Sequence, residues 1–266
     1  MSELRALPVP GIPEVTEGMR VGELIAERAE LADGDVVVIS QKIVSKAEGR
    51  IRRLSSVIPG AEARRLAAVL GREPALVELI LAESREVLRA ERGVLITETK
   101  HGFVCANAGI DTSNLPEEGT VALLPEDPDA SARRIRAEVV GEPGVGVGGR
   151  TDGVSADPYP RLPAIAVVIS DSFGRAWRLG QVEVAIGCAG IAPLDDWRGR
   201  ADAEGRELEA TLIAVADEAA AAADLVRDKA SHTPAAIVRG LERYVTSDDG
   251  PGAAALRRPR GEDFFR

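Results

Sequence analysis

The chain has 266 residues, a mass of 28.0 kDa and 45% hydrophobic residues, enough to bury the core of one large domain or of two small joined ones. Its 43 Asp and Glu residues outnumber 33 Lys and Arg residues, so the formal net charge is -10 and an anionic ligand must be met by a local basic cluster. This acidic balance and the 3% aromatic content argue against a nucleic-acid partner, because such proteins rely on basic surfaces and stacking side chains.

The sequence indicates neither a targeting segment nor a membrane segment. The N-terminus lacks a basic region followed by an apolar one, and no apolar run reaches the length of a bilayer span. We therefore expect a cytoplasmic protein with no membrane partner. The two cysteines, Cys105 and Cys188, are too few for a disulfide framework or a cysteine zinc site, so we expect both to be buried.

The first half of the chain predicts alternating helices and strands. Apolar residues recur at helical spacing in some segments, while turns containing Gly and Asp separate these from short apolar runs. The predicted helices span residues 21–32, 61–70, 74–88 and 129–139. The predicted strands span residues 36–39, 94–97, 103–106 and 121–124.

The second half begins with a change in composition. Gly, Pro, Asp and Ser dominate residues 141–162, which indicates a flexible linker or an insertion. Further strands are predicted at 164–169, 182–191 and 235–238, with a long Ala-rich helix at 204–226. Helices and strands intermingle, so the predicted fold class is α/β, or mixed α+β. The last residues, 248–266, are expected to form a solvated C-terminal tail.

Residues 107–114 read Asn-Ala-Gly-Ile-Asp-Thr-Ser-Asn and follow a predicted strand. Amides, hydroxyls and a carboxylate are concentrated in this short segment. Hard cations such as Mg²⁺ take oxygen ligands, commonly one or two carboxylates together with substrate phosphates, so Asp111 is a candidate metal ligand. The alternative is a turn whose side chains only satisfy neighbouring backbone groups.

A second oxygen-rich segment begins where the predicted strand 164–169 ends. Asp171 and Ser172 follow the carboxyl end of this strand, the place where α/β proteins commonly bind ligands. Asp171 and Asp111 would together supply two acidic ligands on two loops, the minimum for a metal site bridged by phosphate. The alternative is that Asp171 and Ser172 cap a turn or a helix.

Two basic clusters offer partners for anionic ligands, because Arg binds carboxylate and phosphate bidentately and Lys acts as a point charge. Each of these residues, taken alone, is more often a solvated surface charge. The first cluster follows strand 36–39 and the second follows Ser172: Lys42, Lys46, Arg50, Arg52 and Arg53, then Arg175 and Arg178.

Other motifs point to no site. The Gly-rich run at 144–149 lacks the flanking strand and helix of a phosphate-binding loop, so we assign it to the linker. The sequence contains no Gly-Lys-Ser/Thr ending of a P-loop, so a bound nucleotide would be held by another architecture. His101 and His232 have no metal-ligand spacing, and nothing marks a Ser/His/Asp triad.

Six segments in order resemble the coenzyme F420:L-glutamate ligases, the γ-glutamyl ligases of the deazaflavin cofactor. The resemblance implies an α/β fold of two intimately joined sub-domains over residues 1–247 and an intertwined homodimer. Larger relatives carry a C-terminal flavin-binding domain like a nitroreductase, and we expect no such domain and no flavin here. The segments are 7–13 (LPVPGIP), 44–50 (VSKAEGR), 107–114 (NAGIDTSN), 170–175 (SDSFGR), 205–209 (GRELE) and 235–240 (AAIVRG).

The resemblance also implies roles for individual residues. Asp111 and Asp171 resemble ligands of one divalent ion, Mg²⁺ or Mn²⁺, while Ser172 and Asp228 resemble ligands of a second; K⁺ is a further candidate ion. Arg175 and Arg178 are candidates to bind substrate or phosphate. Residues 227–232 depart from the more Gly-rich loop of the family. The implied nucleotide contacts are Pro10, Gly11, Ile12, Pro13, Gln41, Lys42, Lys46, Asn114, Lys229, Ser231 and Thr233.

The activity implied by the resemblance is GTP-dependent addition of L-glutamate to the coenzyme F420 precursor. The γ-phosphoryl group of GTP would pass to a free carboxylate of the acceptor, and the amine of glutamate would then attack the acyl phosphate. No protein nucleophile is needed, because the acceptor's carboxylate attacks. Two alternatives remain: another metal-dependent phosphoryl or nucleotidyl transferase, and a non-catalytic GTP-binding dimer.

Overall fold

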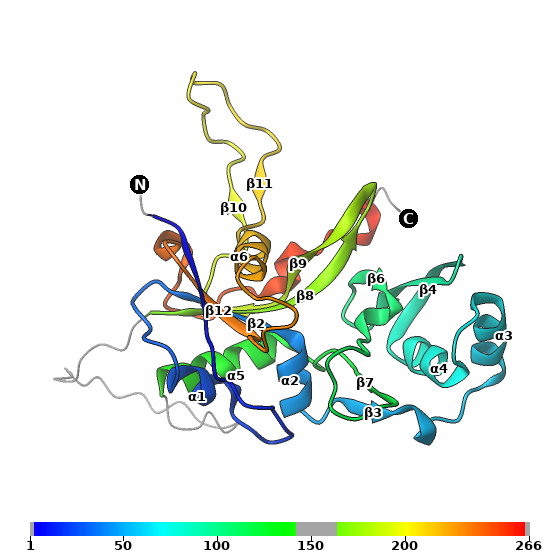
Figure 1. The fold of residues 1–266 in the computed structure, drawn as a ribbon. Helices are drawn as coiled ribbons and strands as arrows, with labels where there is room; N and C mark the ends of the chain where they lie inside the picture. The colour runs from blue at the N-terminus through cyan, green and yellow to red at the C-terminus, as the bar shows by residue number, and fades with distance from the viewer. Residues whose placement is uncertain (1–2, 142–163, 264–266) are drawn as a thin grey trace, which may run out of the picture.

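The computed structural model describes residues 3–141 and 164–263, so the expected linker at 141–162 lies outside the described residues beyond Gly141. The chain forms a large lobe and a small lobe (Figure 1), the small lobe comprising residues 51–122. Several sheets are interspersed with helices, which confirms the mixed α/β class. In the described ranges, no helix has the length and apolar character to cross a membrane.

The large lobe is built on a five-stranded sheet of order β1-β12-β2-β8-β9. Only β2 and β8 run parallel, and the other neighbours are antiparallel. The central strand β2 is buried on both faces, which explains its uninterrupted run of Val and Ile. The strands are β1 (Arg5–Pro8), β2 (Val36–Ser40), β8 (Ala166–Arg175), β9 (Arg178–Ala189) and β12 (Ala235–Arg239).

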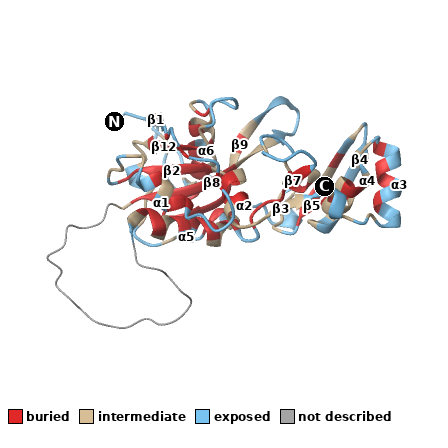
Figure 2. Cartoon of the chain, turned by 60° about the horizontal axis from the view of Figure 1, so that its bottom comes forward, coloured by how far each residue is buried: buried red, intermediate tan, exposed pale blue. Residues whose placement is uncertain are grey.

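Helices cover both faces of this sheet. Val37 and Ile39 of β2 join the apolar cluster that contains the inner side of α5, whereas Val36 and Val38 join the cluster that contains α6. The buried residues therefore lie along β2, β8 and the facing sides of the helices (Figure 2). The helices are α1 (Val21–Ala26), α2 (Gln41–Ala47), α5 (Pro128–Val140) and α6 (Val215–Asp224).

The small lobe has its own apolar cluster, which includes Leu66, Ile80 and Leu95. Its three-stranded sheet has the order β4-β5-β6, and a two-stranded ribbon of β3 and β7 joins the lobe to α2 and α5. Its elements are β3 (Ile51–Arg53), α3 (Ala61–Leu70), α4 (Pro74–Ala82), β4 (Ser84–Glu91), β5 (Val94–Thr99), β6 (Val104–Ala106) and β7 (Thr120–Ala122).

Three predicted elements need correction. The helix predicted at 74–88 ends at Ala82, and β4 follows with alternating exposure, so its last part is a strand. The helix predicted at 204–226 is only α6, because Gly205 takes a left-handed φ of +80° and Asp202 accepts backbone hydrogen bonds in a turn. The short strands β10 (Asp195–Asp196) and β11 (Leu212–Ile213) flank that turn. The helix predicted at 21–32 is α1, which stops at Ala26.

The segment expected to be a solvated tail is partly packed against both lobes. Ala253 is fully buried in the cluster that contains α6, within a short 3-10 helix at Ala253–Leu256. Further on, Arg257 donates a hydrogen bond to the carbonyl oxygen of His101, and Arg260 lies 2.5 Å from the Glu86 carboxylate. The segment therefore connects the large lobe to the small one.

Candidate functional site

A pocket of about 370 Å³ lies at the end of the main sheet where the central strand β2 stops. It faces the loop that carries Asp111. The pairing of β2 with β8 ends at Ser40 and Ser170, and the antiparallel strand β12 begins at the same end of the sheet. Residues that follow β2, continue β8 or precede β12 therefore converge, as expected for ligand sites at the carboxyl ends of parallel strands. The polar lining residues are Glu14, Ser40, Gln41, Lys42, Lys46, Asp111, Ser113, Asn114, Asp171, Ser172, Glu183, Asp224, Arg227, Asp228, Lys229, His232 and Thr233.

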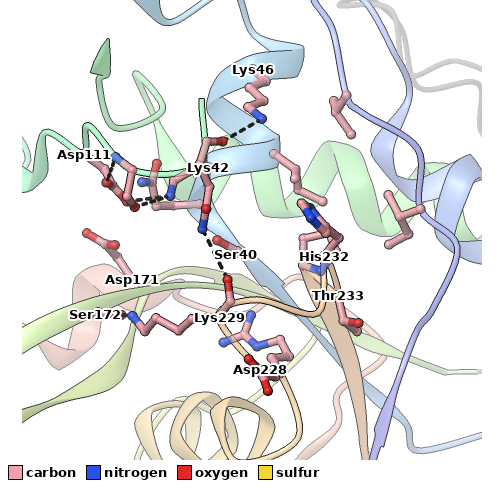
Figure 3. Close-up of a pocket in the computed structure, with 18 of the residues that line it drawn as sticks. Ser40, Lys42, Lys46, Asp111, Asp171, Ser172, Asp228, Lys229, His232 and Thr233 are labelled. Atoms are coloured by element: carbon pink, nitrogen blue, oxygen red, sulfur yellow. Dashed lines mark hydrogen bonds and ion pairs between the residues drawn. The ribbon is translucent and has the colours of Figure 1, made fainter. Parts of the chain in front are cut away.

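Asp111 is held in place by its backbone, which forms an isolated bridge with Ala122. Its carboxylate lies 2.8 Å from Lys42 Nζ and accepts a 2.7 Å hydrogen bond from the backbone N–H of Ser113. Burial alone would raise the pKa of Asp111, but these two donors outweigh it and lower the pKa below its ordinary value. Asp111 is therefore ionised at neutral pH and oriented toward the pocket (Figure 3).

Asp171 lies on β8, which continues as a strand to Arg175, so the expectation of a loop after residue 169 is wrong. The strand pairs with β9 in a hairpin that extends beyond the end of β2. Burial and the negative charge of Glu183 raise the pKa of Asp171 to about 7, with a further contribution from Asp111. The backbone hydrogen bond at Ser172 and the charge of Lys42 lower the pKa of Asp171, but they do not offset burial and the two negative charges.

Ser172, the next residue of β8, is the centre of a hydrogen-bond network. Its hydroxyl donates a 2.5 Å hydrogen bond to Glu183 and accepts a 3.2 Å hydrogen bond from Lys229 Nζ. Glu183 lies opposite Ser172 in the β8–β9 register and forms a buried ion pair with Arg227. Figure 3 shows Asp171, Ser172 and Lys229 together on one side of the pocket.

Lys46 and Asn114 are neighbours in the lining of the pocket. Lys46 Nζ lies 2.5 Å from the Glu14 carboxylate and donates a 3.3 Å hydrogen bond to the Asn114 carbonyl. Asn114 has a left-handed φ of +52°, a conformation that Asn tolerates better than most residues. Its side-chain amide faces the Lys229 carbonyl at 3.5 Å, so the loops before β7 and before β12 meet across the pocket.

Most of the predicted site residues come together in this pocket. All of the predicted metal ligands line it, as do eight of the predicted nucleotide contacts: Ile12, Pro13, Gln41, Lys42, Lys46, Asn114, Lys229 and Thr233. Their assigned roles stay predictions.

Five predicted site residues do not line the pocket: Pro10, Gly11, Ser231, Arg175 and Arg178. The Gly11 carbonyl accepts a hydrogen bond from Arg28 instead. Arg175 and Arg178 lie at the end of the β8–β9 hairpin, where Arg175 donates to the Leu179 carbonyl. Arg175 and Arg178 therefore lie outside the pocket lining, and their role in binding substrate or phosphate stays a prediction.

Sequence reasoning missed several lining residues, among them Glu14, Glu183, Asp224, Arg227 and His232. Glu183 could have been found only from the register of the β8–β9 hairpin, which sets it opposite Ser172. Arg227 precedes the predicted ligand Asp228 in a loop that departs from the family pattern, so that pattern does not mark it. His232 lines the pocket, although its spacing in the sequence suggested no ligand role.

The donor set fits a hard cation that substrate phosphates complete. Within residues 3–141 and 164–263, no three His, Cys, Asp or Glu side chains form a ready metal cluster. Asp111 and Asp171 nevertheless face one pocket. Burial first, and then the negative charges of Glu183 and Asp111, raise the pKa of Asp171, and a bound cation would oppose this rise. Carboxylate and hydroxyl oxygens are ligands that Mg²⁺ takes together with phosphate oxygens.

Comparison with known proteins gives a consistent result over most of the chain. The sequence model of the F420-0:Gamma-glutamyl ligase family matches residues 11–148 and 162–240, leaving the segment between them unmatched. The chain is 43% identical over 264 residues to the coenzyme F420:L-glutamate ligase of Methanothermobacter thermautotrophicus, covering 97% of both chains. It is 43% identical over 265 residues to that of Methanopyrus kandleri, covering 99% of this chain and 98% of the relative. The protein of the same name from Haloarcula marismortui is 41% identical over 270 residues, covering 99% and 96%.

Proposed function

The chain belongs to the F420-0:gamma-glutamyl ligase family, and from this premise we propose that it joins L-glutamate to the coenzyme F420 precursor in a reaction driven by GTP. The enzyme is then a carbon–nitrogen ligase of coenzyme F420 biosynthesis. The observation that carries the proposal is the convergence on one pocket of Asp111 and Asp171 with the ammonium groups of Lys42 and Lys46.

The pocket supports a distribution of roles among its residues. Asp111 and Asp171 would hold one Mg²⁺ or Mn²⁺ ion, and Ser172 with Asp228 would contribute to a second. When bound, such ions neutralise charge on the transferring phosphoryl group. Lys42, Lys46, Lys229 and Asn114 would contact the nucleotide. Lys46 comes from α2 and Lys229 from the loop before β12, so charges from two elements can meet an anionic chain.

The reaction needs two displacement steps. A carboxylate oxygen of the acceptor attacks the γ-phosphorus of GTP, the bond to the β-phosphate oxygen breaks, and GDP leaves with the electron pair. The α-amine of glutamate then attacks the acyl carbon, phosphate leaves, and the nitrogen loses a proton to give an amide. Lysine ammonium groups stabilise the negative charge on the phosphates, which is the main requirement of phosphoryl transfer.

The ion pair between Asp111 and Lys42 prepares both residues for the roles proposed above. Their 2.8 Å ion pair keeps Asp111 ionised and also places Lys42 Nζ in the pocket at the first turn of α2. A carboxylate that stays charged can bind a cation without first releasing a proton.

We propose a homodimer as the working assembly, which light scattering at several concentrations would test.

Mass spectrometry of the acceptor tests the proposal. Purified protein is incubated with the coenzyme F420 precursor, L-glutamate, Mg²⁺ and GTP, and both the glutamylated acceptor and GDP are measured. The proposal requires added glutamyl mass that depends on GTP and on a divalent cation. GDP release without glutamate incorporation would instead indicate a transferase, and GTP binding without turnover would indicate a nucleotide-binding dimer.

Asp111→Asn and Asp127→Ala provide a matched pair of variants for this assay. Asp111 faces the pocket, whereas Asp127 caps α5 through the Ala130 N–H and does not line the pocket. Asp111→Asn should lose at least about 100-fold in ligation, because the cation loses a charged ligand. Asp127→Ala should keep its activity. Full activity in Asp111→Asn would exclude the assigned role.

A further inference from the structure

One wall of the pocket contains an ion pair that the proposed chemistry does not use. Arg227 Nη2 lies 3.1 Å from Glu183 Oε2, and the side chains are only 6% and 8% exposed. The same nitrogen donates a 3.0 Å hydrogen bond to Ser170 Oγ on β8. The pair therefore joins the hairpin β8–β9 to the loop that follows α6, at the edge where the candidate site lies.

This ion pair is a poor device for stability. Arg227 Nε and Nη1 are buried and have no hydrogen-bond partner among the described residues. The attraction in a buried ion pair with unsatisfied donors does not fully offset the free-energy cost of desolvation. Apolar residues of similar volume often give a protein of equal stability. We therefore interpret the ion pair as a contact that fixes the position of Glu183, rather than as one that stabilises the fold.

Glu183 uses both carboxylate oxygens on protein partners. Oε2 accepts from Arg227, and Oε1 accepts the 2.5 Å hydrogen bond from the Ser172 hydroxyl. Both carboxylate oxygens of Glu183 are therefore held by protein partners, which fix the position of the side chain. Glu183 acts on the pocket by its charge, which raises the pKa of Asp171, and separately through the Ser172 hydroxyl that it orients.

The orientation of Ser172 follows from these contacts. Its only hydrogen is given to Glu183, so its lone pairs are turned to the other side, where the Lys229 ammonium approaches Oγ at 3.2 Å. The free side of the hydroxyl therefore already faces a positive group. A hydroxyl whose proton is held by a carboxylate is also a stronger donor of electron density to a cation.

We propose that Glu183, held by Arg227, is a positioning residue that fixes the Ser172 hydroxyl with its lone pairs toward the cation accompanying the nucleotide's phosphates. The inference rests on the proposed function in one respect, that a divalent cation binds beside Ser172. It assigns Glu183 no contact with substrate. Partners in such outer positions commonly change metal affinity about 10- to 100-fold when they are removed.

A cycle of variants at Glu183 and Ser172 tests this assignment. Mn²⁺ binding is measured by electron paramagnetic resonance in the presence of a non-hydrolysable GTP analogue, without acceptor or glutamate. Glu183→Gln should weaken Mn²⁺ binding about tenfold. In a Ser172→Ala background, the same change should have a clearly smaller effect, because no hydroxyl remains to orient and only the charge of Glu183 beside Asp171 is lost. In a Ser172→Thr background, which keeps the hydroxyl, the tenfold effect should return.

Each outcome of the cycle is decisive. An equal effect of Glu183→Gln with and without the hydroxyl would overturn the proposal, since Glu183 would then act independently of Ser172. No effect in any background would overturn it too, as would a wild-type protein that binds no Mn²⁺. A protein that completes the cycle as expected but adds no glutamate would contradict only the ligase assignment.

The buried charge of Arg227 makes one precaution necessary. Glu183→Gln leaves that guanidinium without its carboxylate, a change that often unfolds a protein. Thermal unfolding is therefore measured first on every variant. Should Glu183→Gln alone not fold, the cycle is repeated with Glu183→Gln and Arg227→Gln combined, which removes both charges while Ser172 is varied as before.

Discussion

Asp129 holds the C-terminal segment to the large lobe, and its removal should be costly. Its Oδ1 accepts hydrogen bonds from the backbone N–H groups of Cys188 at 2.9 Å and Ala253 at 2.7 Å, and Oδ2 accepts one from Ala254 at 3.2 Å. A hydrogen bond to a charged group contributes about 1.5–3 kcal/mol, so the two shorter bonds alone predict a loss of about 3–6 kcal/mol in Asp129→Ala. That is a large part of the stability of about 5–15 kcal/mol that is typical of a domain.

The measurement combines urea unfolding with hydrogen exchange. Asp129→Ala should lower the free energy of unfolding by the stated amount and speed the exchange of the amides at Ala253 and Ala254. Asp127→Ala is the matched control, because Asp127 stands at the same helix end and its carboxylate accepts a hydrogen bond from Ala130 N–H, its one partner among residues 3–141 and 164–263. The loss of such an N-cap is typically about 1 kcal/mol. A loss below about 1 kcal/mol in Asp129→Ala, or unchanged exchange, would refute the reasoning.

Three further predictions concern packing and titration. A Cβ at Gly187 would lie 2.2 Å from the Pro128 carbonyl oxygen, so Gly187→Ala should lower the free energy of unfolding in urea by about 3 kcal/mol or more. Gly174 has open space around it, so Gly174→Ala should change that free energy by no more than about 0.5 kcal/mol. Burial raises the pKa of Cys105 and of Cys188 to about 12, so iodoacetamide at pH 8 should label neither thiol until the protein is denatured; rapid labelling of the native protein would contradict this. Burial lowers the pKa of His101, so the unfolded chain binds this proton more readily than the folded protein as the pH falls below about 6.5. The free energy of unfolding therefore declines with falling pH. In His101→Gln, this decline between pH 7.5 and 5 should be smaller.

Sequence patterns predicted the buried part of the fold well. The helix at Ala61–Leu70 and the strand β2 follow directly from apolar periodicity and from an uninterrupted run of β-branched residues. The failures lie where local preference and tertiary context disagree. Residues 84–88 continue an apolar pattern compatible with a helix, yet they pair with β5 as a strand. β1 was not predicted at all, because it is a short edge strand that only its pairing with β12 defines.

The candidate site could be predicted only in part for a similar reason. Asp111, Asp171 and Lys42 stand in segments whose composition marks them, and the structure brings them to one pocket. Arg175 looked equivalent to these residues, but it lies near the end of a hairpin whose length the sequence does not reveal. Glu183 and Arg227 act through contacts between segments far apart in the chain, which no local pattern encodes.

The order of strands in the main sheet has a consequence for the nascent chain. β2 is made early, but its neighbours β8 and β12 come from the second half of the sequence. At about 5–20 residues per second, the ribosome supplies β12 on the order of 10–40 seconds after β2. The small lobe, a continuous segment, can fold during this interval, whereas the apolar face of β2 stays open to mispairing. The binding pocket, which needs residues from both ends of the chain, is therefore among the last features to form.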